Sequence, residues 1–185
     1  VEAHKKQNLA ERLENPAWHI HDGEPPSALT PISFALLMNL VSASNAETKQ
    51  LLWAFIGKYA PGVTPETNPF LDKLCDYAIR YFEDFVKPMK RFRAASDKER
   101  AAFEDLARRL DALPDDITDG EAIQNEVYAV GKEHDFEPLR DWFKALYEVL
   151  FGEESGPRFG QFAAIFGVRQ TSALLRQGLA GDFLR

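Results

Sequence analysis

The fold is decided by residues 119–167, which read DGEAIQNEVYAVGKEHDFEPLRDWFKALYEVLFGEESGPRFGQFAAIFG. Their middle part carries one apolar stripe at helical spacing, formed by Leu139, Trp142, Phe143, Leu146, Tyr147 and Leu150. Pro138 suits the first turn of this helix and Gly152 the position after its last turn. Pro157 begins a further helix with the same spacing of apolar residues. Because an aromatic stripe at this spacing usually packs in a core, we interpret Trp142 and its neighbours first as core residues.

Helical signals recur in the rest of the chain. Thr30 can cap a helix whose body, ISFALLMNLV, is almost entirely apolar, and Asn45 can cap the next one. Asn68 and Pro69 begin a long helix that extends to about residue 86. Each of these signals is a helix start, and no alternating strand pattern accompanies them.

Two capping boxes complete the helical pattern. Ser96 pairs with Glu99, and Thr118 pairs with Glu121. We therefore predict an all-α protein, a helical bundle or α-helix cage of about eight helices without significant sheet. A boundary between two helical parts is expected near residues 112–118.

Composition places the chain among ordinary globular proteins. Its 185 residues are 45% hydrophobic and 28% charged, with a net charge of −7. The single cysteine, Cys75, excludes an internal disulfide and a cysteine-based zinc finger, and its helical context favours a buried small hydrophobe. No apolar run approaches the length of a membrane span and no signal peptide is recognised, so we expect a cytoplasmic protein.

One basic cluster stands out in this acidic chain. It is KPMKRFR, residues 87–93, followed by Lys98 and Arg100. The total charge argues against a general nucleic-acid binder, but phosphate contacts depend on the local field. Two interpretations remain open: a phosphate-binding patch, or cations that complement a helix C-terminus and stay solvated.

Two short patterns resemble known sites but lack essential parts. The run from Trp18 to His21 has neither the nucleotide-binding sheet of a synthetase signature nor the further ligands of a metal site. Residues 115–126 nearly match a calcium loop, but Ile117 stands at a ligand position, and a capped helix start explains the same residues.

Three segments carry a resemblance to a known family. NEVYAVGKEHDFEPLRDWFKALYEVLFGEESGPRFGQFAAIFG resembles the closing region of class I lysyl-tRNA synthetases. NPAWHIHDGEPPSALTPISFALLMNLVSASNAE and DYAIRYFEDFVKP resemble the segment that follows the catalytic domain in that family. The resemblance implies an all-α anticodon-binding unit, similar to that of the related glutamyl enzymes.

The resemblance also implies a domain organisation and a separate role for each domain. Residues 1–28 would connect to an absent catalytic domain, residues 29–114 would form a first helical subdomain, and residues 115–185 the anticodon-binding subdomain. The whole enzyme would join lysine to its tRNA with ATP and Mg²⁺. This part would contain no catalytic residue, cofactor or metal. Its partners would be the anticodon stem-loop of a lysine tRNA and the catalytic domain, but neither a membrane nor DNA.

Two sets of residues are candidates for RNA contact. Single-stranded loops are read by stacking bases on aromatic or arginine planes. Those members of the first set that are exposed are expected to contact anticodon bases: Trp142, Arg158, Phe159, Phe162 and Arg169. The second set is expected to contact phosphates: Lys87, Lys90, Arg91, Arg93, Arg140 and Lys144.

Two other functions are kept as alternatives. A helical protein-interaction module without RNA binding fits the acidic total charge and would show an exposed apolar groove. A helical metal enzyme would require a bound metal.

Overall fold

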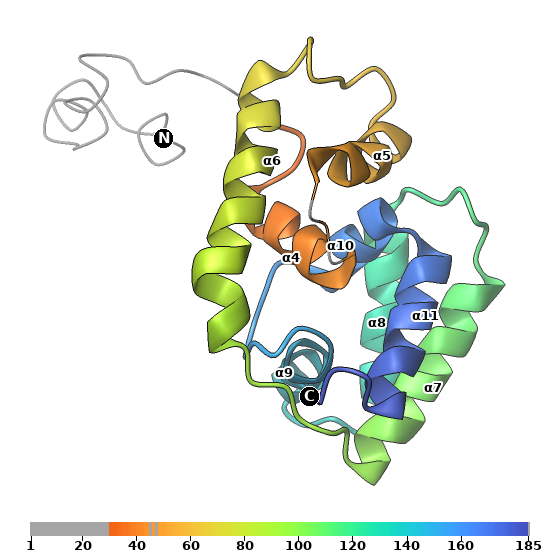
Figure 1. Ribbon diagram of the computed structural model, residues 1–185. Coiled ribbons are helices and arrows are strands. Elements are labelled where there is room, and N and C mark those ends of the chain that lie inside the picture. Colours follow the sequence, from red (N-terminus) through yellow and green to blue (C-terminus); the bar gives the residue numbers. More distant parts are fainter. Residues whose placement is uncertain (1–29, 45, 47, 185) are drawn as a thin grey trace, which may run out of the picture. The chain divides into compact units, whose positions relative to one another are not determined.

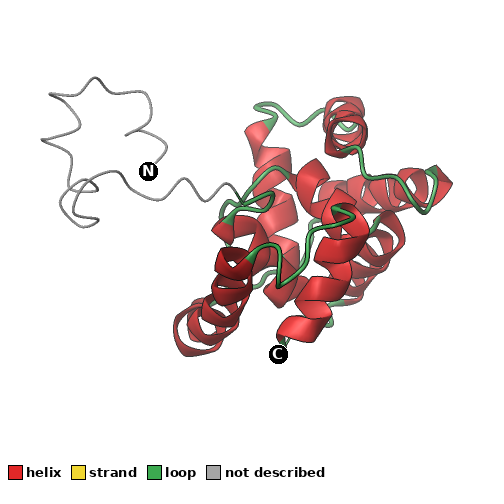
Figure 2. Ribbon diagram, turned by 90° about the horizontal axis from the view of Figure 1, so that it is seen from above, coloured by secondary structure: helices red, strands yellow, loops and turns green. Residues whose placement is uncertain are grey.

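The computed structural model of the protein describes residues 30–44, 46 and 48–184. Ile32–Arg185 forms one compact unit. Within the described residues there are eight α-helices and no strand, which confirms the predicted all-α fold (Figures 1 and 2). The helices are α4 (Phe34–Ser44), α5 (Lys49–Tyr59), α6 (Pro69–Tyr81), α7 (Asp97–Ala112), α8 (Gly120–Glu133), α9 (Arg140–Leu150), α10 (Phe159–Phe166) and α11 (Val168–Ala180).

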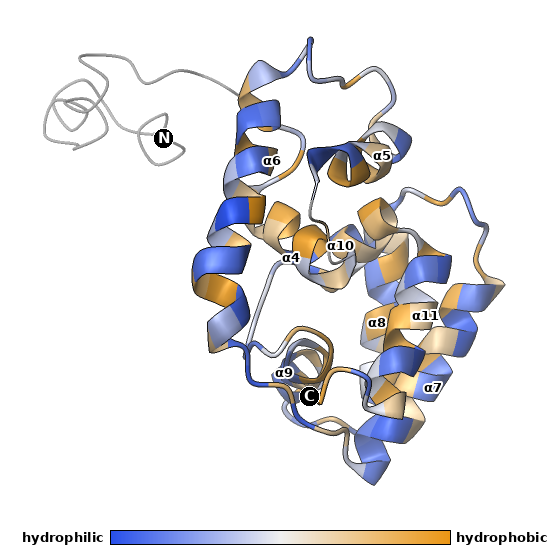
Figure 3. Cartoon of the chain, in the orientation of Figure 1, coloured by the Kyte–Doolittle hydropathy of each residue, from blue (hydrophilic) through white to orange (hydrophobic). Residues whose placement is uncertain are grey.

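The helices pack around one continuous core. Helix α7 packs against both α8 and α11, and the three lie side by side in Figure 1. Helix α10 packs against α8 and also contacts α4, α5 and α11. Hydrophobic residues are concentrated on α4 and α10 in the middle of the view, whereas α7 carries many hydrophilic residues (Figure 3). The stretch 119–167 supplies α8, α9 and α10, and α10 is the one that contacts four other helices.

A glycine allows α10 to approach α8 closely. A Cβ atom added at Gly160 would lie 2.4 Å from the carbonyl oxygen of Gly120 and 2.5 Å from the backbone nitrogen of Gln124. The backbone nitrogen of Gly160 instead donates a 2.7 Å hydrogen bond to Oε1 of the buried Gln124 side chain. This contact satisfies one of the orphan donors at the start of α10 and fixes its position on α8.

Several helix starts differ from the sequence prediction by a few residues. Helix α4 begins at Phe34, and the Ser33 hydroxyl accepts a hydrogen bond from the Leu36 backbone nitrogen, so Thr30 is not its cap. Helix α5 follows Thr48, while the predicted cap Asn45 lies outside the described residues. Helix ends are the least determined part of a periodic pattern, because several polar residues near each end can serve as caps.

The two predicted capping boxes have different outcomes. The box of Ser96 and Glu99 is present at the start of α7, which confirms the prediction. The box at Thr118 is wrong by one residue. Asp119 is the N-cap of α8, and its carboxylate accepts hydrogen bonds from the backbone nitrogens of Glu121 and Ala122. A carboxylate here also complements the positive end of the helix dipole.

The long helix that begins at Pro69 changes its winding near its end. The α-helical part stops at Tyr81, a π-helical turn follows over Phe82–Val86, and a 3₁₀ turn covers Lys87–Met89. Cys75 is buried on the inner face, as predicted, and burial raises the pKa of its thiol to about 12. The thiol therefore remains protonated and packs as a small hydrophobe. None of the helices that the structure describes has both the length and the hydrophobicity needed to cross a bilayer.

Candidate nucleic-acid interface

An open pocket of about 580 Å³ lies between α8, α9 and the loop that leads into α10. It brings together four of the predicted contact residues, which are Arg140, Lys144, Arg158 and Phe159. The remaining lining residues are Gln124, Tyr128, Asp141, Phe143, Tyr147, Glu154, Ser155, Gly156 and Pro157. We refer to this feature as the α9 pocket.

The loop on one side of the α9 pocket is fastened to α9 through Tyr147. The Tyr147 hydroxyl donates a hydrogen bond to the carbonyl oxygen of Pro157. Gly156 lies directly against the ring, since a Cβ atom added there would be 2.1 Å from Cε1 of Tyr147. Burial raises the pKa of the Tyr147 hydroxyl above its ordinary value, so this group remains a hydrogen-bond donor. The loop and the helix therefore form a preformed wall.

Two partly exposed aromatic rings also line the α9 pocket. Tyr128 and Phe143 meet edge to face, with 5.2 Å between ring centroids and an interplanar angle of 74°. Both have part of their surface free in the pocket. Neither ring was predicted from the sequence as a binding residue, because Phe143 belongs to the apolar stripe of α9. Its position at the edge of that stripe is the sequence signal for its partial exposure.

Three basic side chains surround the mouth of the α9 pocket. Arg140 is 89% exposed and lies 3.9 Å from Asp141. Lys144 lies 3.5 Å from Glu148 and 3.7 Å from Glu154. The pairs with Asp141 and Glu154 are exposed and contribute little to stability, so exchanging these carboxylates for a phosphate oxygen costs little free energy. Glu148 is only 19% exposed and also pairs with Arg93.

Arg158 is the third of these cations. Its guanidinium donates a 2.7 Å hydrogen bond to Glu121, and both side chains are largely exposed. Arg158 also lines a second, smaller pocket of about 330 Å³ that includes Tyr59 and Gln161. It is therefore placed between two hollows of the surface, at the N-terminus of α10.

Three predicted aromatic contacts are buried instead. Trp142, Phe159 and Phe162 have no exposed side-chain surface, so none of them offers a face on which a base could stack. Phe159 reaches the α9 pocket only as part of its floor. The interpretation of the α9 stripe as core is confirmed for Trp142, Leu146 and Leu150, whereas Phe143 is only partly buried.

Arg169 holds the connection between α7 and α8. Its guanidinium lies 2.5 Å from the carboxylate of Asp115 and donates to the carbonyl oxygens of Asp111 and Leu113. These carbonyls belong to the C-terminal end of α7, where orphan acceptors need partners. The contacts give Arg169 a structural role in this conformation.

The basic run 87–93 is largely used by the fold itself. Lys90 has only 5% of its side chain exposed, and its ammonium donates to the carbonyl oxygen of Phe151 at 2.5 Å and to the Ser42 hydroxyl at 2.6 Å. Glu153 lies 3.3 Å away, and the Phe82 ring centroid 5.3 Å away. Burial lowers the pKa of Lys90, and the charge of Glu153 opposes this effect. Lys90 therefore joins α4 to the end of α9.

The neighbouring cations divide between fold and surface. Arg93 makes 2.7 Å contacts with both Glu99 and Glu148, which neutralise it. Lys87 pairs with Glu83 at 2.9 Å on the exposed surface. Arg91 is exposed and donates to the carbonyl oxygen of Lys90 at 3.0 Å. Of the run, only Lys87 and Arg91 are sufficiently exposed to meet a phosphate.

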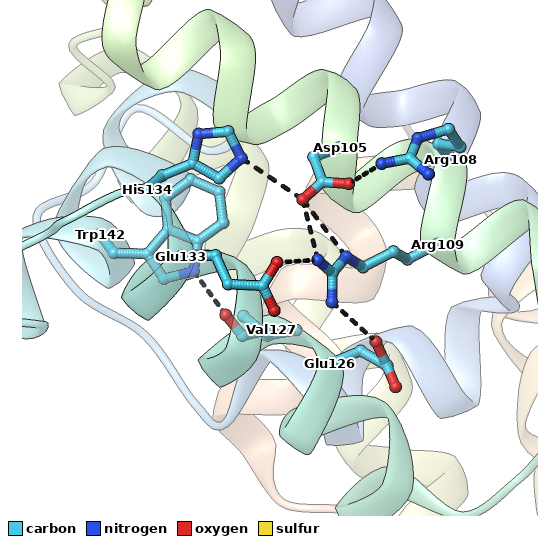
Figure 4. Close-up of polar contacts among 8 residues, drawn as sticks. All are labelled: Asp105, Arg108, Arg109, Glu126, Val127, Glu133, His134 and Trp142. Atoms are coloured by element: carbon cyan, nitrogen blue, oxygen red, sulfur yellow. Dashed lines mark hydrogen bonds and ion pairs between the residues drawn. The ribbon is translucent and has the colours of Figure 1, made fainter.

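Ion pairs join α7 to α8, which is one of the helices that line the α9 pocket (Figure 4). Arg109 contacts Asp105 on its own helix and Glu126 and Glu133 on α8. Nε2 of His134 lies 3.3 Å from Asp105. Burial alone would raise the pKa of Asp105, but hydrogen bonds and charge from Arg109 hold it below its ordinary value. The indole of Trp142 joins α9 to α8 by donating to the Val127 carbonyl at 2.9 Å.

The chain shows strong similarity to lysine–tRNA ligases along its whole length. It is 53% identical over 184 residues to the lysine–tRNA ligase of Roseobacter denitrificans, and this match covers 100% of the chain and 34% of that ligase. It is 42% identical over 173 residues to the enzyme of Rickettsia felis and 43% identical over 175 residues to that of Rickettsia conorii. In both cases 93% of the chain and 33% of the ligase are covered.

The chain is homologous to lysine–tRNA ligases. It spans about a third of the length of the curated relatives that it matches. No family model matches the chain, and no solved structure matches it.

The ligase relationship raises the question of whether this part could hold ATP or a metal ion. In the part of the chain that the structure describes, no group of three or more His, Cys, Asp or Glu side chains is placed to hold a metal. The carboxylates of the calcium-like loop have other partners, since Asp115 contacts Arg169 and Glu126 contacts Arg109. The run from Trp18 to His21 lies outside the described residues. We therefore derive no step through ATP or Mg²⁺ from these residues.

Proposed function

We propose that this chain is the C-terminal, anticodon-binding part of a class I lysyl-tRNA synthetase and that the α9 pocket receives an unstacked base of the anticodon loop. The observation that carries the proposal is that the pocket combines a partly exposed aromatic pair with three basic side chains on one preformed surface. Homology over the whole chain to lysine–tRNA ligases supports a tRNA as the ligand.

The proposed binding mode divides the pocket into floor and rim. A splayed base stacks on the exposed part of the Tyr128 or Phe143 ring, where stacking contributes about 1–3 kcal/mol per base. Arg140 and Lys144 bind the phosphates on either side of that base. Arg158 releases Glu121 and donates instead to a base edge or a phosphate oxygen. A guanidinium suits either partner because it carries several N–H donors in a planar arrangement.

The acidic total charge is compatible with this mode. The net charge is −7, but the rim of the α9 pocket presents three cations from α9 and the start of α10. Asp141, Glu154 and Glu121 are exposed carboxylate partners that a phosphate can replace. Glu148 beside Lys144 is less exposed and stays paired with Arg93. Lys87 and Arg91 extend the proposal as secondary phosphate contacts.

Under this proposal the full-length synthetase joins lysine to its tRNA with ATP and Mg²⁺ in the cytoplasm. The catalytic residues and the sites for both cofactors belong to the portion outside this chain. The division into a connector (1–28), a first helical subdomain (29–114) and an anticodon-binding subdomain (115–185) stays a prediction. All residues assigned above to the α9 pocket fall within the last of these.

A titration of the chain with a labelled anticodon stem-loop tests the proposal. Fluorescence anisotropy is measured with the stem-loop of a lysine tRNA and with one whose loop sequence is scrambled, each at two salt concentrations. We expect tighter binding to the lysine loop and weaker binding of both at high salt. Equal affinity for both loops without salt dependence would instead support the helical protein-interaction module.

A further inference from the structure

A row of exposed apolar side chains runs along the outer face of α6 and the turns that follow it. Their exposed fractions are high for such large side chains, from 49% to 71%. The row comprises Phe70 (49%), Tyr77 (58%), Tyr81 (49%), Phe85 (62%) and Met89 (71%). We call it the α6 stripe.

The α6 stripe is separate from the core face of the same helix. Leu71, Cys75 and Ala78 are fully buried on the inner face. Tyr77 and Tyr81 are four residues apart on α6, so their side chains share its outer face. The rings of Tyr81 and Phe85 lie 5.3 Å apart, which joins this face to the π-helical turn that follows. One apolar face of this helix is buried in the core, so the other, exposed apolar face is available to bind a partner.

The charges beside the α6 stripe favour a protein surface over a nucleic acid. Acidic and basic residues alternate along it, among them Lys73, Asp76, Arg80, Glu83 and Asp84. Glu83 is paired with Lys87. A nucleic-acid site would present an excess of positive charge, which this face lacks. Aromatic residues and methionine are, in contrast, enriched in the centres of protein–protein interfaces.

The chain enters the compact unit beside the α6 stripe. Phe34 is the first residue of α4, is 36% exposed, and packs edge to face on Tyr81 with 6.2 Å between centroids. The first helix of the unit therefore begins beside the stripe. A domain linked through the backbone to this helix has a high effective concentration at nearby surfaces of the unit.

We propose that the α6 stripe is the surface on which the preceding portion of the ligase polypeptide docks. This inference rests on the proposed function, under which the chain is the C-terminal third of such a ligase. The contact fixes the distance between the α9 pocket and the catalytic portion, so that a tRNA bound in the pocket presents its acceptor end to the reaction.

Hydroxyl-radical footprinting of the 185-residue chain and of the full-length ligase tests this proposal. Mass spectrometry follows the labelling rates of Tyr77, Phe85 and Met89, with Tyr128 in the α9 pocket as an internal reference. We expect the three stripe residues to be labelled at least five-fold more slowly in the full-length ligase than in the chain, and Tyr128 at a similar rate in both. Equal labelling of the stripe in the two proteins would overturn the proposal.

Three other outcomes would also overturn it, each by identifying a different occupant. Slow labelling in the chain alone at every concentration points to residues of the chain itself. Slow labelling that develops only as the chain is concentrated points to a second copy. Protection that requires added tRNA points to RNA.

A variant separates a docking role from a folding role. Because Phe85 is 62% exposed, Phe85→Asp should leave the melting temperature of the 185-residue chain unchanged. In the full-length ligase it should raise the labelling of Tyr77 and Met89 to the rate seen in the chain. Unchanged slow labelling in that variant would contradict docking through the stripe. None of these measurements involves the anticodon loop, so failure of stem-loop binding at the α9 pocket is recognised separately.

Discussion

The indole nitrogen of Trp142 donates a hydrogen bond of 2.9 Å to the carbonyl oxygen of Val127 and thereby joins α9 to α8. The Trp142 ring also packs edge to face on Phe103 of α7, with 5.5 Å between centroids. One side chain thus connects three helices behind the α9 pocket. On α9, Trp142 therefore holds the helices together, whereas its neighbour Phe143 lines the α9 pocket.

This division predicts different effects for two neighbouring aromatic residues. Trp142→Phe removes the indole hydrogen bond to the Val127 carbonyl and leaves a small void, so we expect a loss of about 1–3 kcal/mol in the free energy of unfolding. Phe143→Leu should cost less stability but weaken stem-loop binding by about 1–3 kcal/mol if a base stacks there. Urea unfolding and anisotropy titration measure the two effects. A stable Trp142→Phe protein without RNA affinity would contradict the assignment.

Within the basic run, truncation of Lys90 should lower the stability of the protein, whereas truncation of Arg91 should leave it almost unchanged. Lys90→Ala removes a buried side chain and leaves the Phe151 carbonyl without its ammonium donor, while Glu153 is exposed enough to be solvated, so we expect a loss of about 1–3 kcal/mol in stability. Arg91→Ala removes an exposed side chain and should change stability by less than about 0.5 kcal/mol. Chemical denaturation compares the two variants, and similar stabilities would show that Lys90 is not a structural connection.

The close approach of α10 to α8 predicts that Gly160→Ala is destabilising. The added Cβ atom meets backbone atoms of Gly120 and Gln124, so the helices must separate at a cost of about 1–3 kcal/mol. Gly57→Ala is the matched control, because no atom lies within 4 Å of a Cβ added at that position in α5. Alanine there should stabilise the protein by about 0.5–1 kcal/mol. Melting temperatures that move in the same direction would contradict this packing.

The start of α7 predicts a specific pH dependence. A hydrogen bond from Arg93 is the largest cause that lowers the pKa of Glu99 from its ordinary value of 4.5, while burial opposes it. Since the folded pKa is the lower one, Glu99 contributes stability above pH 4.5 and loses this contribution as the pH falls through the folded pKa. The stability difference between the wild type and Glu99→Gln should therefore be constant from about pH 6 to 8 and shrink below about pH 4.5. A constant difference down to about pH 3 would contradict the ion pair.

The sequence predicted the fold well because its signals are local. The α9 stripe, Pro69, and the Ser96 capping box each mark a helix through the spacing of a few residues, and the structure places helices there. Helix α11 was not assigned individually. This helix packs against α7, which is distant in the sequence, and the periodicity of residues 168–180 does not show which helix lies against it.

The site was predicted less completely because exposure depends on tertiary packing. Periodicity gives the apolar side of α9 but not its margin, so it did not separate the buried Trp142 from the partly exposed Phe143. A cluster of cations likewise does not reveal that Lys90 is enclosed while Arg91 is exposed. The exposure of Arg140 and Lys144 could be predicted because both lie on the polar side of a clearly periodic helix, whereas their contact with phosphate stays a prediction.

The most direct test of the account is the salt dependence of stem-loop binding in a variant of the pocket rim. Arg140→Ala combined with Lys144→Ala is compared with Lys58→Ala, which removes an exposed lysine of α5 that does not line the α9 pocket. Dissociation constants for the lysine stem-loop are measured over a range of salt concentrations. The account predicts that the rim variant binds more weakly and that its salt slope falls by about 0.7 for each phosphate that no longer meets a cation, while Lys58→Ala behaves like the wild type. A rim variant with the affinity and slope of the wild type would contradict the claim that the α9 pocket binds the anticodon loop.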